Sequence, residues 1–155
     1  MLDVSCIIIN YNTSNYTFEA VRSLYETHKN NLNFEIIVVD NASKKDDYTN
    51  LKSKLDSLHK NNLQLIRSTI NTGFGGGNML GVSNASPTKY YAFINNDTLQ
   101  VSEYCLKYLM EFLEAQPQAG LCSPQMVDEH KNFRVTIDHF SSLQREILRR
   151  PFLET

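Results

Sequence analysis

The fold is decided near the N-terminus by the stretch Val4-Ser5-Cys6-Ile7-Ile8-Ile9, which leads directly into Asn10-Tyr11-Asn12. The first six residues are nearly all apolar and rich in β-branched side chains, which is typical of a strand buried on both faces. The polar residues that follow end this strand and offer N-caps for a helix. A buried strand that leads into a helix predicts a parallel sheet covered by helices.

The same alternation of strand and helix continues along the chain. Further strands are predicted at residues 34–39, 63–67, 90–94 and 119–123. Helices are predicted at residues 16–27, 46–60, from within a glycine-rich segment through Val82, at 102–115 and at 143–150, with hairpin arms at 125–127 and 133–136. We therefore expect an α/β fold with a mostly parallel, doubly wound sheet.

Composition indicates a globular protein without an electrostatic preference for nucleic acid. The chain has 155 residues, of which 41% are hydrophobic, and a formal net charge of -2. This length fits one domain or most of one. Purely apolar runs, such as residues 6–9, reach at most five residues and are far shorter than the roughly 20 residues of a membrane span. With no signal-peptide pattern at the start, we expect a cytoplasmic location.

Cysteine and histidine spacing does not indicate a metal site or a disulfide framework. The three cysteines, Cys6, Cys105 and Cys122, are odd in number and far apart, so we expect small buried side chains in a reducing compartment. The four histidines show no ligand spacing, and we expect His28 and His59 at helix ends or in solvent.

Polar segments follow several of the predicted strands. They are residues 10–12, 40–41 and 95–97, and a glycine-rich segment follows the third strand. Ligands of open parallel sheets bind at the carboxyl ends of the strands, so these four segments converge where a ligand would bind. Loops at strand ends are polar in any case, so the prediction rests on the convergence and not on one segment.

The glycine-rich segment Asn71-Thr72-Gly73-Phe74-Gly75-Gly76-Gly77-Asn78 matches neither standard phosphate-binding motif. A dinucleotide fingerprint would follow the first strand and would have glycine in place of Asn78. Residues 76–81 have the spacing of a P-loop, but the chain has Val82 where a P-loop has its phosphate-binding lysine. Two interpretations are left open: a tight turn from strand to helix, or backbone that approaches a ligand at a helix N-terminus.

Two aspartates at strand ends have both a functional and a structural interpretation. Asp97 could hold Mg²⁺ or Mn²⁺ together with substrate phosphates, or could form an Asx-turn or cap the next helix. Asp40 could accept hydrogen bonds from a ribose or a base, or cap the segment that follows it.

Four motifs, taken in order, resemble family 2 of the inverting glycosyltransferases. They are residues 5–12, 37–43, 71–78 and 93–98, and their spacing looks like the rhamnosyltransferase-like branch, which builds bacterial cell-surface polysaccharides. The resemblance covers residues 4–136. It implies a GT-A fold that binds a nucleotide-diphosphate sugar, dTDP- or UDP-linked, with Mg²⁺ or Mn²⁺.

The resemblance also implies roles for individual residues. Residues 10–12 would border the nucleobase, Asp40 would contact base or ribose, and residues 71–78 would close over nucleotide and sugar. Residues 95–97 stand where the family's D-x-D motif holds the metal and diphosphate, with Asn95 in place of the first aspartate. The expected nucleotide-sugar-binding set is Asn10, Tyr11, Asn12, Asp40, Asn41, Asn71, Gly73, Phe74, Gly75, Gly76, Asn78, Asn95 and Asn96, with Asp97 as metal ligand.

The family's general base is not found in this chain and is expected beyond Thr155. We therefore expect residues 1–136 to be the nucleotide-sugar-binding core and residues 137–155 to be the truncated start of an acceptor-side region, so that this chain alone is inactive. The acceptor would be a cell-surface polysaccharide or a lipid-linked glycan, reached at the inner face of the membrane. The alternatives are a nucleotide-binding module that acts through a partner and, last, a Rossmann oxidoreductase.

Overall fold

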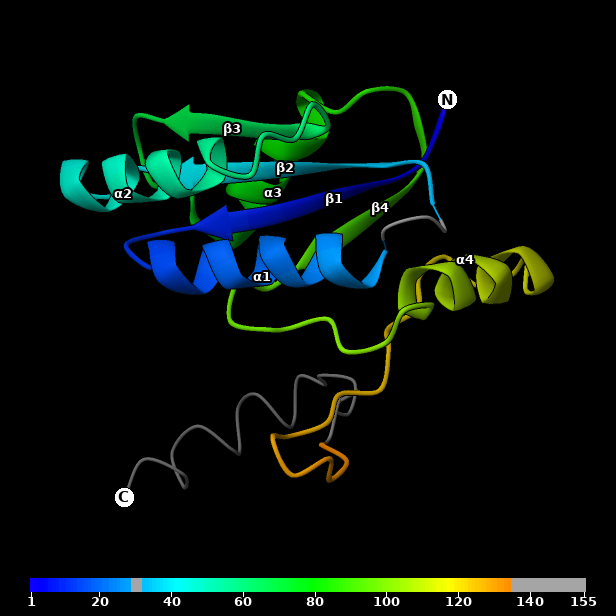
Figure 1. The fold of residues 1–155 in the computed structure, drawn as a ribbon. Coiled ribbons are helices and arrows are strands. Elements are labelled where there is room, and N and C mark those ends of the chain that lie inside the picture. Colours follow the sequence, from blue (N-terminus) through cyan, green and yellow to red (C-terminus); the bar gives the residue numbers. More distant parts are fainter. Residues whose placement is uncertain (29–31, 135–155) are drawn as a thin grey trace, which may run out of the picture.

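The computed structural model describes residues 1–28 and 32–134, and its centre is a parallel sheet (Figure 1). Within these residues the sheet has four strands in the order β3-β2-β1-β4, and each pair of neighbours is parallel. The strands are β1 (Leu2–Asn10), β2 (Phe34–Asn41), β3 (Leu63–Ser68) and β4 (Thr88–Ile94). The chain first builds outward from β1 to β3 and then returns to place β4 on the other side of β1. The order of the strands therefore reverses at β1.

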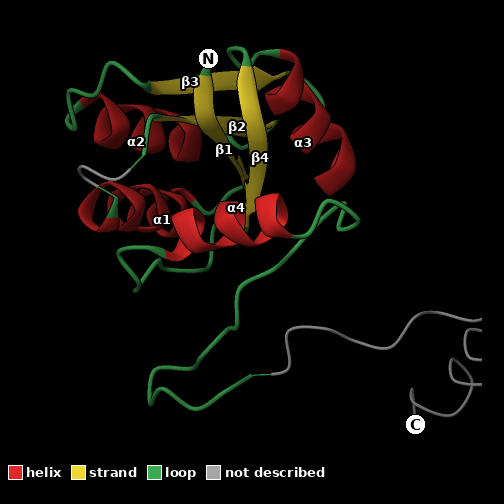
Figure 2. Ribbon diagram, turned by 90° about the vertical axis from the view of Figure 1, so that its right-hand side faces the viewer, coloured by secondary structure: helices red, strands yellow, loops and turns green. Residues whose placement is uncertain are grey.

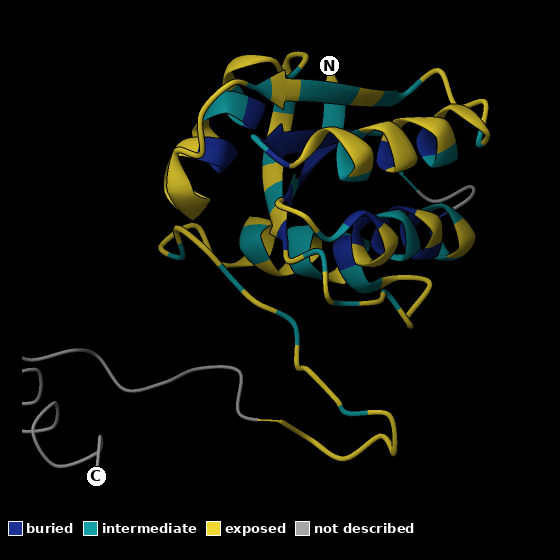
Figure 3. Ribbon diagram, turned by 90° about the vertical axis from the view of Figure 1, so that its left-hand side faces the viewer, coloured by how far each residue is buried: buried dark blue, intermediate teal, exposed yellow. Residues whose placement is uncertain are grey.

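Helices cover both faces of the sheet, which confirms the predicted doubly wound α/β fold. They are α1 (Ser14–Thr27), α2 (Lys45–Asp56), α3 (Gly73–Ser83) and α4 (Cys105–Ala115). Helices α1 and α2 lie on one face and α3 lies on the other (Figures 1 and 2). Figure 3 shows that α1 and α2 turn their buried residues toward the sheet and their exposed residues toward solvent.

The core lies mainly between the sheet and helices α1 and α2. The two inner strands are buried on both faces, as their unbroken apolar sequence predicts. On the first face Ile8 and Val38 pack with Leu24 of α1 and Leu51 of α2. Leu106 of α4 joins the same cluster. Burial of these side chains holds the carboxyl ends of the strands in fixed positions.

Glycines allow α3 to pack closely against the opposite face. A Cβ atom added to Gly81 would lie 2.5 Å from Cγ2 of Ile7, and one added to Gly77 would lie 3.0 Å from Cδ1 of Ile9. At these two positions the glycines serve helix–sheet packing. This supports the structural interpretation of that part of the glycine-rich segment.

Several predicted elements differ from the structure. The strand predicted at residues 119–123 is absent: this segment follows a turn in which the Ala119 amide donates to the Gln116 carbonyl, and it joins no strand in the described residues. Of the predicted hairpin, the described residues show one antiparallel bridge, Val127 to Phe133, and residues 135 and 136 of its second arm lie outside them. Helix α2 ends at Asp56, before the predicted residue 60. A short turn follows it, in which the Leu58 amide donates to the Leu55 carbonyl and the His59 amide donates to the Asp56 carbonyl. The helix predicted at residues 143–150 lies outside the described residues.

All three cysteines are free; Cys6 is fully buried, which raises the pKa of its thiol to about 12, whereas Cys105 and Cys122 are half-buried. His28 lies at the C-terminal end of α1, as predicted, but it is fully buried. In the described ranges, every helix is too short or too polar to cross a membrane.

Candidate functional site

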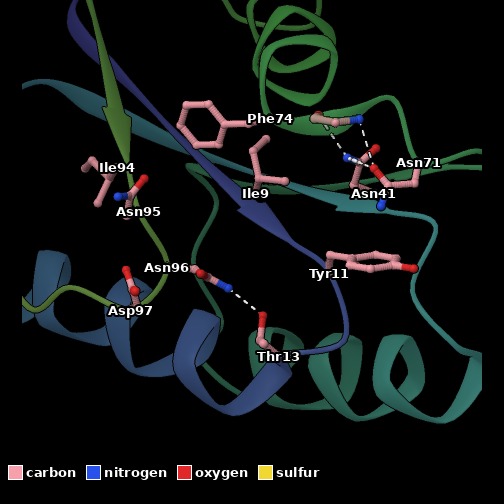
Figure 4. A pocket seen from close by; sticks show the side chains of 11 residues that line it. Ile9, Tyr11, Thr13, Asn41, Asn71, Phe74, Ile94, Asn95, Asn96 and Asp97 are labelled. Carbon is pink, nitrogen blue, oxygen red and sulfur yellow. Dashed lines mark hydrogen bonds between the residues drawn. The ribbon is translucent and has the colours of Figure 1, made fainter. Parts of the chain in front are cut away.

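A pocket opens at the carboxyl ends of β1 and β4, where the strand order reverses (Figure 4). This is the position at which open parallel sheets bind their ligands. Its volume is about 410 Å³. The lining residues are Ile9, Tyr11, Thr13, Asn41, Asn71, Gly73, Phe74, Ile94, Asn95, Asn96 and Asp97.

The structure brings part of the predicted site set together. Eight predicted residues line the pocket: Tyr11, Asn41, Asn71, Gly73, Phe74, Asn95, Asn96 and Asp97. Six others do not line it: Asn10, Asn12, Asp40, Gly75, Gly76 and Asn78. Three lining residues were missed by the sequence analysis, namely Ile9, Thr13 and Ile94. Each of the three adjoins a predicted polar segment, and this adjacency was the signal available in the sequence.

One rim of the pocket is the turn that leads into α3. Asn41, at the end of β2, organises this turn: its Nδ2 donates to Oδ1 of Asn71 at 2.9 Å and to the carbonyl of Gly73 at 3.0 Å. Its Oδ1 accepts from the amide of Thr72 at 3.1 Å. Gly73 has φ +71°, a conformation that glycine adopts without strain. Asn41 therefore fixes where α3 begins.

The N-terminus of α3 differs from those of α1 and α2 in its electrostatics. Each helix carries partial positive charge at its N-terminus, and all three begin at the same edge of the sheet. Asp47, in the first turn of α2, also accepts from the amide of Ser14, the first residue of α1, at 3.0 Å. The first turn of α3 contains no acidic residue. This leaves the positive end of α3 available to an anion in the pocket.

The opposite rim is the turn after β4. The hydroxyl of Thr98 donates to the carbonyl of Asn95 at 2.7 Å and closes the turn. Asp97 is exposed, and its carboxylate has no hydrogen bond or ion pair within residues 1–28 and 32–134. Helix α4 begins only at Cys105, with Tyr104 at its N-cap, so Asp97 does not cap that helix. The carboxylate is thus left accessible at the pocket.

Two aromatic side chains stand at the pocket, Tyr11 after β1 and Phe74 in α3 (Figure 4). They are 50% and 59% exposed. Such rings offer flat faces to a planar or apolar part of a ligand. Asn12, by contrast, is turned toward α2, where its Oδ1 accepts from the amide of Lys44 at 2.8 Å.

Asp40 lies in the protein interior beside the pocket and does not line it. It is fully buried, and its Oδ1 accepts from Nδ2 of Asn10 at 2.9 Å. Its Oδ2 accepts from the amide of Ser43 at 3.3 Å and lies 3.5 Å from Nε of Arg67. In this conformation Asp40 caps the turn after β2, which is the structural interpretation left open by the sequence. Arg67 also stacks on the ring of Tyr48, 4.1 Å from its centroid.

The residues at the pocket fit a divalent cation that is shared with a ligand. The described residues contain no cluster of three or more His, Cys, Asp or Glu side chains placed to hold a metal ion. The accessible carboxylate of Asp97 is one hard oxygen ligand, and the neighbouring asparagines add amide oxygens. Mg²⁺ is commonly held by one or two carboxylates together with substrate phosphates. The arrangement therefore suits a cation that arrives with a diphosphate.

Solved structures share this fold. The chain resembles residues 1–349 of TarS from S. aureus (TM-score 0.61, 23% identity), covering 74% of this chain and 33% of that one. It also resembles the mannosyltransferase PcManGT from Pyrobaculum calidifontis, in complex with GDP-Man and Mn²⁺ (TM-score 0.64, 20% identity), covering 72% of this chain and 32% of that one. A TarS complex with UDP-GlcNAc has a TM-score of 0.59 at 22% identity, covering 74% and 32% of the two chains.

These likenesses show a GT-A type of fold, and this chain spans about a third of the length of those structures. No curated protein matches the chain. The sequence pattern of Glycosyl transferase family 2 matches residues 5–154, nearly the whole chain. The protein therefore belongs to Glycosyl transferase family 2.

Proposed function

We propose that this protein supplies the sugar-donor site of a glycosyltransferase, which transfers a sugar from a nucleotide-diphosphate sugar to an acceptor hydroxyl. One observation carries the proposal: the accessible Asp97 carboxylate and the N-terminus of α3 face each other across one pocket at the strand switch point. A cation beside Asp97 and the positive end of α3 are both suited to a diphosphate. Family membership supports the same assignment.

The nucleoside would lie against Tyr11, with the diphosphate between Asp97 and the start of α3. The sugar would then meet Phe74 and Asn95, which line the same pocket. Asp40 is buried beside Asn10, so its contact with a base or ribose would require the turn after β2 to open. We therefore propose that Asp40 mainly shapes the base end of the pocket and contacts the base or ribose only when this turn opens.

Negative charge develops on the leaving diphosphate as the sugar–phosphate bond breaks. A bound Mg²⁺ or Mn²⁺ would supply electrostatic stabilisation of that charge. Asp97 would hold the cation, and the amide groups at the start of α3 would donate to the diphosphate oxygens. The exposure of Asp97 keeps it available for this role.

We propose an inverting reaction. The acceptor hydroxyl would attack the anomeric carbon from the side opposite the diphosphate, and a general base would take its proton. The new carbon–oxygen bond forms as the nucleoside diphosphate departs. The base is proposed to lie beyond Thr155, outside this chain.

The finer assignments follow from the resemblance and the neighbours. We propose a dTDP- or UDP-linked hexose or rhamnose as donor; the neighbours' complexes with UDP-GlcNAc and GDP-Man add these two to the candidates. A glycan or lipid-linked acceptor in polysaccharide synthesis, at the inner face of the bacterial membrane, is proposed for the full-length protein.

A donor screen on the full-length protein tests this function. UDP-, dTDP- and GDP-linked sugars would each be incubated with Mn²⁺ and acceptor extract, and the released nucleoside diphosphate would be measured. Binding of each nucleotide would be measured separately by calorimetry. Release that is lost in Asp97→Asn and kept in Asp56→Asn supports the proposal. Asp56 is a matched control because it is an exposed carboxylate at the far end of α2, paired with Lys52. Failure of every nucleotide to bind would refute the proposal, whereas binding without release would favour a module that only binds nucleotide.

A further inference from the structure

A chain of hydrogen bonds runs beneath the pocket from the end of β2 to the turn after β4. Nδ2 of Asn10 donates to Oδ1 of Asp40 at 2.9 Å, and Oδ1 of Asn10 accepts from the Thr17 hydroxyl at 2.8 Å. Oγ1 of Thr17 in turn accepts from Nδ2 of Asn96 at 2.9 Å. Four residues from β1, β2, α1 and the β4 turn are thereby linked.

Thr17 is the central link, although it does not line the pocket. It is fully buried in α1, and its hydroxyl has a single proton. That proton is directed to Oδ1 of Asn10 at 2.8 Å, with the Thr13 carbonyl at 3.3 Å as a second acceptor. The Asn96 nitrogen can only donate, so the oxygen of Thr17 accepts from it. The hydroxyl of Thr13 lies 2.6 Å from the same Asn96 nitrogen (Figure 4).

These two contacts set the orientation of the Asn96 amide. Both use Nδ2, and no described residue donates to its Oδ1. The amide is therefore held with its nitrogen toward α1 and its oxygen available next to Asp97. A buried network of this kind fixes one geometry, since any other orientation leaves polar groups unpaired.

We propose that Thr17 is a positioning residue for the diphosphate end of the sugar donor. Its hydroxyl holds the Asn96–Asp97 turn in the orientation that receives the diphosphate and its cation, without touching either. The inference rests on the proposed function. It predicts that loss of the hydroxyl weakens binding of the diphosphate end while binding of the nucleoside is kept.

The variants Thr17→Val and Thr17→Ser test this role in the full-length protein. Valine keeps the shape of the side chain and removes the hydroxyl, whereas serine keeps the hydroxyl. UDP binding in the presence of MnCl₂ would be measured by calorimetry, and uridine binding by NMR titration. We expect UDP to bind about tenfold more weakly to Thr17→Val, or about 1.4 kcal/mol. Uridine binding should change by less than about twofold, and Thr17→Ser should restore most of the UDP affinity.

A double-mutant cycle with Asn96→Ala separates this role from a general structural one. If Thr17 acts through Asn96, Thr17→Val should cause little further loss of UDP affinity once Asn96 is truncated. Equal losses for UDP and uridine, an unchanged UDP affinity, or additive losses in the cycle would each overturn the inference.

A second variant keeps the test valid if Thr17→Val does not fold, as judged by thermal unfolding. Thr13→Val removes the other acceptor of Asn96 and should give a smaller loss of UDP affinity that is again absent in Asn96→Ala. A wild-type protein that binds none of UDP, dTDP and GDP would instead contradict the proposed function itself.

Discussion

Asp40 and Asp97 have the same setting in the sequence and opposite settings in the structure. Each follows an apolar strand and adjoins asparagine. Asp40 is fully buried and accepts from Asn10 and Ser43, whereas Asp97 is exposed and unpaired in the described part of the chain. An aspartate at a strand end is therefore buried as part of the scaffold or left accessible to solvent, according to what packs beside it.

The neighbouring elements explain this difference. Strand β2 lies between β1 and β3, and α2 begins at Lys45, so the turn after β2 is covered at once. Strand β4 pairs only with β1 in the described residues, and α4 does not begin until Cys105. A long segment therefore leaves the turn after β4 accessible to solvent and ligand.

The largest expected effect is on activity, through the exposed aspartate. Asp97→Asn should lower the rate of sugar transfer by roughly 100-fold or more, because one preorganised charge at the leaving group is lost. Its free energy of unfolding should change by less than about 0.5 kcal/mol, since exposed sites tolerate substitution. Transfer assays and urea unfolding on the same variant measure both. A large loss of stability would erase the contrast with Asp40.

The buried aspartate should show the reverse pattern. Asp40→Ala removes the acceptor of the buried Ser43 amide and the carboxylate beside Arg67. It also removes one of the three acceptors of the Asn10 amide, which keeps Ser43 and Asp47. We expect the free energy of unfolding to fall by about 2–3 kcal/mol. Urea unfolding measures this, and Asp97→Asn is the matched comparison. An unchanged midpoint would show that the network around Asp40 contributes little.

The position of α3 gives a third test, because this helix forms the rim that faces Asp97. In Gly81→Ala the new methyl group would meet Ile7, which is fully buried in the centre of β1 and cannot move aside. We expect a net loss of about 1 kcal/mol after the gain in helix propensity. Gly75→Ala is the control: its Cβ would meet open space and should stabilise α3 slightly. Thermal unfolding of both variants distinguishes packing from propensity.

The smallest expected effect is the dependence of the free energy of unfolding on pH that the buried His28 causes. Burial lowers the pKa of His28, and the backbone of Glu103 offsets part of this effect. The unfolded chain therefore binds a proton more readily than the folded protein. Stability should be complete above the ordinary histidine pKa, about 6.5, and should fall as the pH drops through it.

Asp47 should affect the free energy of unfolding in a different pH range. Burial raises the pKa of Asp47, but hydrogen bonds from Asn10 and Ser14 outweigh it and hold the pKa below its ordinary value of 3.8. Its contribution is present above that value and is lost only as the pH falls further. Urea unfolding between pH 7.5 and 5.5 thus isolates His28. The His28→Gln variant should show a flatter slope there, and an unchanged slope would contradict this assignment.

The fold was predictable because its signals are local and repeated. Unbroken apolar runs marked β1 and β2, and the helical spacing in α1 and α4 marked the helices between strands. The strand predicted at residues 119–123 was wrong because an apolar run becomes a strand only when a neighbour accepts its backbone hydrogen bonds. Residues 119–123 have no such neighbouring strand in the described residues. This segment contacts α4 through a side chain: Sγ of Cys122 lies 3.6 Å from the carbonyl of Leu109.

The site was predictable as a region and less so as individual side chains. The sequence predicts that the strand-end segments converge, and in the structure Asn41, Phe74 and Asp97 from these segments line one pocket. Their contribution to catalysis stays a prediction. Asp40 is buried and lies beside Arg67, which is far from it in the sequence, so no local sequence pattern predicts this contact. For the same reason Thr17, one of several polar residues at the start of a helix, carried no signal of its own.

Asp47 has a consequence for how the protein opens and closes locally. Because this carboxylate belongs to α2 and caps Ser14 of α1, the first turn of each helix depends on the docking of the other. Asn50 of α2 adds a second link, donating to the Ser14 hydroxyl at 2.9 Å. The two helix ends should therefore behave as one cooperative unit. In hydrogen-exchange measurements, the amides at the starts of α1 and α2 should lose protection together, at one common opening free energy.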